Sequence, residues 1–304
     1  MNPWLRLGLI FALLGSCSAQ ECSSIVFPLN VFTKNGLAVQ GVVPDRLLVQ
    51  VHDEPAKINR FSLDTSPRRV VLLLDTSGSM AGIKHNEWEF AVNLALFAIN
   101  TIPSDASISV GSIGEKSQFG DFGDHAQAEA RVRALTKKSF GGHTPLFDSI
   151  HQALGKLSTP HFGDVVYLVT DGGNNASKLD EQAILSELAR HDTRVFALLL
   201  TRIVTYTREE RIGPSLIGEL VHKTGGHLTI VPAPPLSRTR QTLLFKTAPL
   251  VRWQIGNSYR MVVALAEPIK EPASVKIRYT GPDKELGKSF RWVYPSLIGC
   301  HPAP

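Results

Sequence analysis

Short, uninterrupted runs of apolar residues recur along the central two thirds of the chain. The runs at 69–74, 165–170 and 195–200 are almost entirely apolar, and the first two are rich in β-branched residues. Continuous apolar runs of this length are typical of strands buried on both faces of a parallel sheet. The predicted strands cover residues 69–74, 108–113, 165–170, 195–200 and 228–231. A further segment, residues 118–122, is predicted to pair antiparallel with the second strand at the sheet edge.

The segments between these runs have apolar residues at helical spacing. The predicted helices cover residues 88–99, 126–135, 146–157, 179–190, 216–222 and 236–247. Alternation of strands and helices predicts an α/β fold, a doubly wound, mainly parallel Rossmann-like sheet with helices on both faces and right-handed crossovers.

The two ends of the chain have a different pattern, with short strand-like segments separated by turn residues. The predicted strands are residues 25–27, 47–51, 58–63, 259–265, 275–279 and 290–294. A small sheet from one end alone is marginal in stability. The two ends are therefore expected to pack together as one β-module. The predicted divisions are an N-terminal β-segment at 20–66, the α/β domain at 67–247 and a C-terminal β-segment at 248–304.

The first 19 residues predict export. Arg6 precedes the apolar run Leu7–Leu14, and small residues follow up to Ala19. A short charged region, a short hydrophobic core and a small-residue end are typical of a secretory signal. No later run approaches the length of a spanning helix.

Two cleavage sites are compatible with this signal. Cleavage near Ala19 would release a secreted or periplasmic protein. Alternatively, residues 14–17 resemble a bacterial lipobox, and cleavage there would leave a lipid anchor on Cys17, the one expected contact with a membrane.

Cysteine content and charge indicate the redox compartment and the class of partner. Cys22 and Cys300 remain in the mature chain, and in an oxidising compartment they are predicted to form a disulfide; two free thiols are the alternative. The formal net charge is +5, with basic residues scattered singly. This distribution predicts a solvated surface and no nucleic-acid partner.

Polar residues follow two of the buried strands at the point where each strand ends. Asp75, Ser77 and Ser79 follow the first strand, and Asp171 follows the strand at 165–170. Thr144 stands at a predicted helix start in a glycine-flanked turn. The carboxyl ends of parallel strands share one sheet edge, where α/β folds bind ligands. Carboxylate and hydroxyl oxygens suit Mg²⁺, Mn²⁺ or Ca²⁺, so these residues predict a divalent cation site.

This pattern resembles the von Willebrand factor A (VWA) family and its metal-ion-dependent adhesion site (MIDAS). The family motif is Asp-x-Ser-x-Ser, a distant Thr and a distant Asp. Asp75, Ser77, Ser79, Thr144 and Asp171 match it in order and in strand context, over residues 69–247. The two ends are similar, more loosely, to those of secreted bacterial VWA proteins with β-flanks.

The resemblance implies a binding protein and not an enzyme. A divalent cation, Mg²⁺ before Mn²⁺ or Ca²⁺, would be held by the five residues. A protein or peptide partner would complete the metal shell with an Asp or Glu side chain.

Other residues are placed near this site. Asp148 is expected to orient the Thr144 loop as an outer-shell group, and Gly78 and Gly172 lie beside metal ligands in sequence. His143 is expected either to contact a ligand or to face solvent. Loop 201–214, with Arg202, Arg208 and Arg211, would either meet an acidic partner or simply be solvated.

Two alternatives to metal-dependent partner binding remain. Asp75 at a strand end could be the nucleophile of a Mg²⁺-dependent phosphotransfer enzyme, although Thr76 and Ser77 stand where such enzymes usually have a second acid. A serine hydrolase is disfavoured because no Gly-x-Ser-x-Gly motif is present. The metal could also serve only to stabilise the fold.

Overall fold

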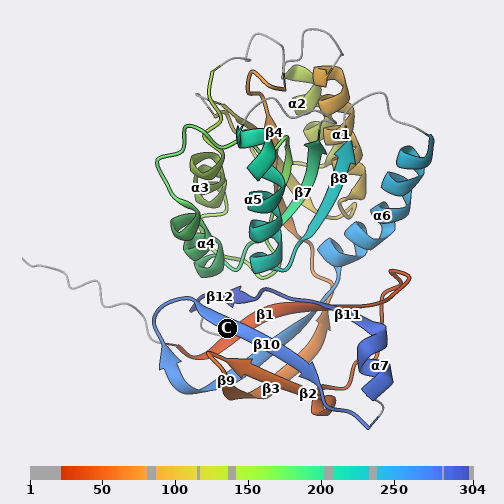
Figure 1. The fold of residues 1–304 in the computed structure, drawn as a ribbon, viewed down its shortest axis with the longest axis vertical. Helices are drawn as coiled ribbons and strands as arrows, with labels where there is room; N and C mark the ends of the chain where they lie inside the picture. Colours follow the sequence, from red (N-terminus) through yellow and green to blue (C-terminus); the bar gives the residue numbers. More distant parts are fainter. Residues whose placement is uncertain are drawn as a thin grey trace, which may run out of the picture.

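The structure is a computed structural model that describes residues 22–80, 87–114, 117–135, 142–201, 208–232, 238–282 and 284–300. Two sheets make up the molecule, an α/β unit above and an antiparallel, curled sheet below (Figure 1). The predicted signal segment, including Cys17, lies outside the described residues.

The upper sheet has five parallel strands in the order β5-β4-β6-β7-β8. Their bounds are β4 (Arg69–Asp75), β5 (Ser107–Ile113), β6 (Val165–Thr170), β7 (Arg194–Thr201) and β8 (His227–Pro232). β4 and β6 are neighbours, so the strands that end in Asp75 and just before Asp171 lie side by side. The predicted strands and their parallel arrangement are confirmed.

The predicted antiparallel edge segment is also confirmed. Phe119 forms a bridge with Gly111 of β5, and Gly123 forms one with Ile108. A Cβ on Gly111 would lie 2.7 Å from the Phe119 ring, so glycine at this position lets the edge segment approach the strand.

Helices cover both faces of the parallel sheet. The side chains of β4 alternate between them, so Val70 and Leu72 pack on one face and Val71 and Leu73 on the other. The first face is covered by α1 (Glu87–Thr101), α2 (His125–Ala134) and α6 (Arg238–Gly256). The second is covered by α3 (Leu146–Lys156), α4 (Glu181–Arg190) and α5 (Arg208–Thr224). This arrangement confirms the doubly wound α/β class.

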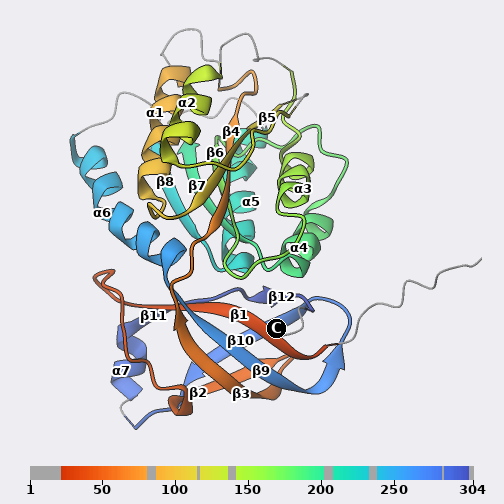
Figure 2. The same ribbon diagram turned by 180° about the vertical axis from the view of Figure 1, so that it is seen from behind.

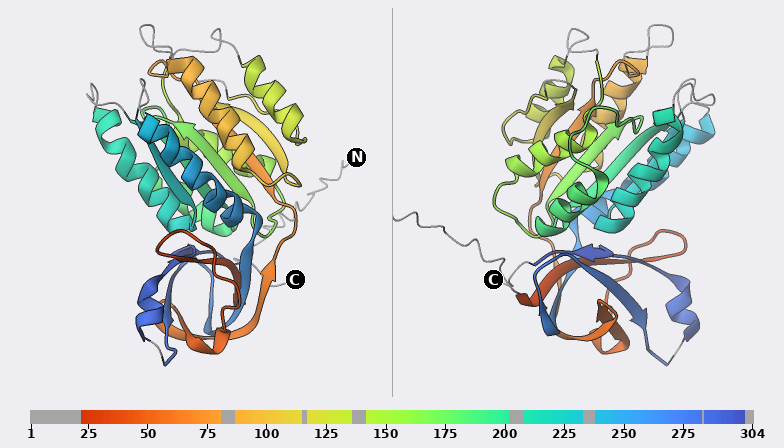
Figure 3. Two further views of the ribbon diagram at one scale, coloured as in Figure 1. Left: turned by 90° about the vertical axis from the view of Figure 1, so that its right-hand side faces the viewer. Right: turned by 60° about the vertical axis from the view of Figure 1, so that its left-hand side comes forward.

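The lower sheet joins the two ends of the chain in the strand order β11-β1-β9-β3-β2-β10-β12. Its strands are β1 (Cys22–Thr33), β2 (Leu47–Val51), β3 (Glu54–Asp64), β9 (Ser258–Ile269), β10 (Ala273–Tyr279), β11 (Phe290–Val293) and β12 (Leu297–Ile298). β11 and β12 lie at opposite ends of that order, yet only three residues separate them in sequence. The segment 290–298 therefore closes the sheet on itself, and Figure 3 shows the curled outline.

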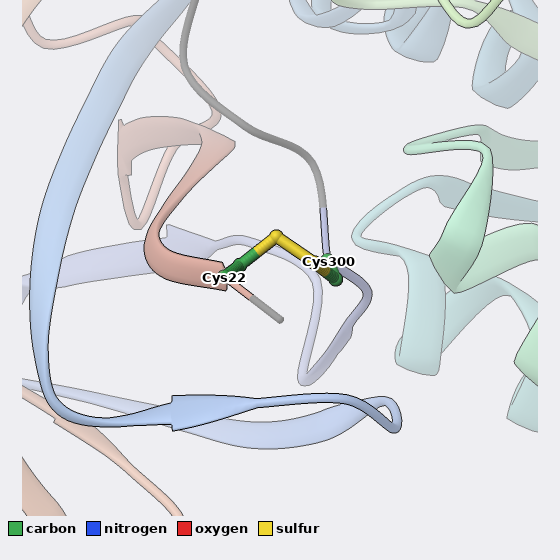
Figure 4. Close-up of a disulfide and its surroundings, with 2 residues drawn as sticks. All are labelled: Cys22 and Cys300. Atoms are coloured by element: carbon green, nitrogen blue, oxygen red, sulfur yellow. A yellow bond between two sulfur atoms is a disulfide. The ribbon is translucent and has the colours of Figure 1, made fainter. Parts of the chain in front are cut away.

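The Cys22–Cys300 disulfide holds this closure at the chain ends (Figure 4). Cys22 begins β1, Cys300 follows β12, and their Cα atoms are 5.5 Å apart. The predicted pairing is present in the structure, and the predicted shared β-module is confirmed.

Two helix predictions need correction, and two short elements were not predicted. The helix expected at 236–247 continues through Pro249 to Gly256, because Val251 and Ile255 are buried against the parallel sheet and this packing outweighs the disruptive effect of proline. This helix thus crosses residue 247, where the end of the α/β domain was predicted. The helix expected at 216–222 begins earlier, at Arg208. A short helix, α7 (Lys284–Ser289), and a 3-10 turn, η1 (Pro44–Arg46), were not predicted.

None of the described helices is both long and apolar enough to span a membrane.

Two buried arginines connect the sheets at the end of α6. The Ile255 carbonyl accepts hydrogen bonds from Arg68 Nε at 3.2 Å and from Arg194 Nη2 at 3.3 Å. Arg194 Nη1 also donates to the Gln254 carbonyl at 2.7 Å. The last carbonyls of a helix have no partner within the helix, so these guanidinium groups satisfy them. They do so at the end of α6, where the chain passes into β9 (Figure 2).

Replacing Arg194 should therefore destabilise the protein. We expect Arg194→Met to lower the free energy of unfolding by about 2–4 kcal/mol, because buried carbonyls lose charged donors. Urea unfolding followed by circular dichroism measures this. Arg190→Met is the matched control, since Arg190 forms only an exposed ion pair with Glu271 and should change stability by less than about 1 kcal/mol. Equal effects of the two substitutions would contradict this role.

Candidate metal centre

The candidate site lies where β4 and β6 end, at the carboxyl edge of the parallel sheet. Asp75 is the last residue of β4, and Asp171 directly follows β6. The two strands are paired in parallel with Leu74 opposite Val169, which brings both aspartates to the same edge. Thr144 lies just before α3 and is buried.

Asp75 is fully buried and its carboxylate is held from two sides. Ser77 N donates to Asp75 Oδ1 at 2.9 Å, and Thr170 Oγ1 donates to Oδ2 at 2.6 Å. The hydroxyl oxygens of Ser77 and Ser79 are 3.0 Å apart. The first motif is thus folded into one compact turn of oxygen donors.

Asp171 and Thr144 converge on the backbone at Gly173. Gly173 N donates to Asp171 Oδ1 at 3.1 Å, and a Cβ on Gly173 would lie 3.5 Å from Thr144 Oγ1. Asp171 Oδ2 is buried and has no hydrogen-bond partner among the described residues. A buried carboxylate oxygen without a partner is costly, which points to a ligand that the protein itself does not supply.

The charges at this edge are also unbalanced. Burial and the negative charge of Asp171 raise the pKa of Asp75 to about 7, against the opposing hydrogen bonds from Thr170 and Ser77. A divalent cation would relieve both the burial penalty and the repulsion.

The donor set fits a hard cation. Over the described part of the chain, no group of three or more His, Cys, Asp or Glu side chains is placed to hold a metal ion. The described residues at this edge offer three hydroxyl ligands beside the two carboxylates, those of Ser77, Ser79 and Thr144. Neutral oxygen donors with two negative charges are suited to Mg²⁺ with some water retained, and less to softer ions.

Asn175 fixes the position of Thr144 and was not predicted from the sequence. Thr144 N donates to Asn175 Oδ1 at 2.8 Å, and Asn175 N donates to the Thr144 carbonyl at 3.1 Å. The two loops are thereby locked together by a reciprocal pair. The available sequence signal was the turn composition Gly-Gly-Asn-Asn directly after Asp171.

Asp148 supports the same loop by a different route. Its carboxylate accepts hydrogen bonds from Lys178 N at 3.0 Å and Leu179 N at 3.1 Å. It therefore contacts the loop that carries Asn175, which is itself hydrogen-bonded to Thr144, and its predicted role in orienting the Thr144 loop stays a prediction.

The remaining predicted residues vary in their placement. A Cβ on Gly78 would lie 3.9 Å from the Gly142 carbonyl, which places the first motif against the Thr144 loop. Gly172 has a φ of +85° and lies against the backbone of Gly213, where a side chain would clash. His143 is exposed. Arg208 and Arg211 are exposed near the start of α5, and Arg202 lies outside the described residues.

Several solved structures are similar to this chain in fold, at low sequence identity. A von Willebrand factor type A protein from Catenulispora acidiphila is 14% identical, with 88% of this chain and 72% of that chain covered and a TM-score of 0.45. Proximal thread matrix protein 1 from the mussel byssus, with a zinc-occupied MIDAS motif, is 16% identical, with 67% and 50% covered and a TM-score of 0.49; this chain thus spans half of that protein's length. BatB from Bacteroides thetaiotaomicron is 12% identical, with 62% and 100% covered and a TM-score of 0.46.

No protein-family model and no curated protein sequence matches the chain. The solved structures are too distant to assign residues or ligands here. The chain has a VWA-like α/β fold. This follows from its strand order, from the helices on both faces of the parallel sheet and from the position of both aspartates at one sheet edge.

Removing the Asn175 side chain should loosen Thr144. We expect Asn175→Ala to speed hydrogen exchange of the Thr144 amide and to weaken Mn²⁺ binding by about tenfold, as the loss of outer-shell groups does at other metal sites. Amide exchange and calorimetry measure the two effects. Asn100→Ala is the matched control, because its side chain bonds only within α1. Unchanged exchange and affinity would contradict the positioning role.

Proposed function

We propose that this protein binds a divalent cation at the edge of its parallel sheet and uses it to bind a protein partner. The ligands are Asp75, Ser77, Ser79, Thr144 and Asp171. The observation that carries the proposal is the unpartnered, buried Asp171 Oδ2 beside a second buried carboxylate. Mg²⁺ is favoured, and Mn²⁺ or Ca²⁺ can replace it in the proposed site.

Each ligand has a defined task in this proposal. Asp75 and Asp171 supply the negative charge that holds the ion. Ser77, Ser79 and Thr144 are neutral donors, so the protein balances the ion's two positive charges without exceeding them. The bound ion then supplies an electrophilic coordination position for the carboxylate of an Asp or Glu side chain on a protein or peptide partner.

A phosphotransfer enzyme remains the alternative with a different chemistry. A nucleophilic aspartate needs an accessible carboxylate oxygen. Asp75 is fully buried, and both of its oxygens already accept hydrogen bonds. This arrangement favours a fixed metal ligand over a nucleophile. A phosphatase activity lost in Asp75→Asn would favour the enzyme instead.

The other alternative is a metal that only stabilises the fold. Whether the Asp75→Ala variant still folds distinguishes this alternative from metal-dependent partner binding. Asp75→Ala removes one of two repelling buried carboxylates, so we propose that the variant stays folded while losing metal and partner binding. Unfolding of the variant would favour the structural role.

Export is part of the proposal. The Cys22–Cys300 bond joins the two chain ends, and such bonds persist in oxidising compartments. We propose a secreted or periplasmic location, either as a released protein or as one held to a membrane by a lipid on Cys17.

Titration of Mg²⁺ and Mn²⁺ by calorimetry tests the site. We expect one ion per chain, with affinity lowered by more than about tenfold in Thr144→Ala and in Asp171→Asn, because each loses a direct ligand. Thr65→Ala, at an exposed position away from the site, is the control and should bind as the wild type does. Equal binding by all four proteins would contradict the assignment.

Selection from a random peptide library in the presence of Mn²⁺ tests the partner chemistry. Selected peptides should contain an essential Asp or Glu and should be released by EDTA, because their carboxylate completes the metal shell. The Asp→Asn and Glu→Gln versions of each peptide serve as matched controls. Binders that survive EDTA or lack an acidic residue would count against metal-mediated capture.

A further inference from the structure

A second cleft lies at the other end of the α/β unit, between the two sheets. It has a volume of about 710 Å³. One wall is formed by the end of α5 and the start of β8, and the other by β10 and the segment that links β11 to β12. These elements meet at the lower edge of the parallel sheet in Figure 1, opposite the carboxyl edge that holds Asp75. The volume is in the range of small-ligand sites.

The lining of this cleft is basic. Its lysine, arginine and histidine side chains are His222, Lys223, His227, Lys276 and Arg291, and no Asp or Glu of the described residues lines it. The carboxylates that pair with the two lysines, Glu219 and Asp53, do not line the cleft.

Arg291, unlike the two lysines, forms no ion pair with a described carboxylate. Its guanidinium lies over the Phe32 ring, 5.4 Å from the centroid, and no described carboxylate lies within ion-pair distance. Partial burial lowers its pKa. The ring supports one face of the guanidinium and leaves its N–H groups to other acceptors.

Two further lining residues of the cleft, Ser296 and His227, can serve a ligand. Ser296 Oγ is buried and has no hydrogen-bond partner among the described residues, while the Ser296 carbonyl is fixed by Val275 N at 3.0 Å. Burial and the nearby charge of Arg291 lower the pKa of His227 to about 4, so its ring is neutral and can both donate and accept.

The partial negative charge at the C-terminal end of α5 does not offset the positive charge of the cleft lining. The carbonyls of Val221 and His222 accept hydrogen bonds from Gly226 N and Gly225 N, so they are turned into the helix cap. Gln254 Nε2 donates to the carbonyls of both glycines.

The aromatic side chains of the cleft are held in fixed orientations. Trp292 Nε1 donates to the Gly287 carbonyl at 3.3 Å, and its ring stacks on Tyr279. Tyr294 OH accepts from Ile277 N at 3.1 Å. Rigid aromatic walls beside an unpaired cation suit a ligand that has both an anionic group and an apolar part.

We propose that this cleft is an anion-binding site, in which Arg291 and Ser296 hold a carboxylate or phosphate group and Trp292 and Tyr294 pack against the rest of the ligand. The site is independent of the cation site, since the two lie at opposite edges of the parallel sheet. The protein thus offers two separate binding positions for acidic ligands, one through a cation and one through its own basic side chains.

Calorimetric titrations in EDTA test this site without the metal site. The probes are inorganic phosphate and a tetraglutamate peptide with a C-terminal tryptophan. We expect saturable binding of at least one probe, weakened about tenfold in Arg291→Gln, as loss of a charged hydrogen-bond donor implies. Binding of phosphate would show that a free oxyanion is sufficient for binding. Binding of the peptide alone would show that the site needs a carboxylate-bearing segment. Either result supports the anion-binding site.

Two variants guard against a folding artefact. Arg278→Gln removes an exposed arginine of β10 that does not line the cleft, and it should bind as the wild type does. Ser296→Ala keeps every positive charge and should still weaken binding. The unfolding temperature of each variant is measured alongside. No saturable binding of either probe, or equal binding by the wild type and a folded Arg291→Gln protein, would overturn the proposal.

Discussion

The parallel pairing of β4 with β6 is the constraint on which the candidate site depends. It delivers Asp75 and Asp171 to one buried edge, where their negative charges repel and one oxygen has no partner. Two such buried carboxylates destabilise each other unless a positive charge compensates them. The hydroxyls of Ser77, Ser79 and Thr144 then make a cation a better fit than a basic side chain.

The second feature is the way in which the antiparallel sheet is joined to the α/β unit. Both ends of the chain are used in it, and the segment 290–298 closes it by pairing with β1 at one end and β10 at the other. Arg68 and Arg194 bind the last carbonyls of α6 at the point where the chain enters β9. The basic cleft lies between the same two sheets, where the end of α5 and the start of β8 face β10 and β11, and it is remote from the cation site.

Sequence patterns were sufficient for the central parallel strands, because β4, β6 and β7 are nearly continuous apolar runs that are buried on both faces. They also identified Asp75 and Asp171, since both come directly after such runs. They could not give the contact between Thr144 and Asn175, which depends on how two loops meet, 31 residues apart. The length of α6 was also missed, because Pro249 indicates a helix end locally while burial of Val251 and Ile255 continues the helix. The basic cleft was likewise hidden, since its residues come from four separate elements.

The most direct test of the central claim is a crystal structure of the protein grown with Mn²⁺, with anomalous diffraction used to locate the ion. We expect a single strong anomalous peak bounded by Asp75, Asp171 and Thr144, with the oxygens of Ser77 and Ser79 directed at it. A crystal with Mn²⁺ bound elsewhere, or with these five side chains fully solvated and no ion between them, would contradict it.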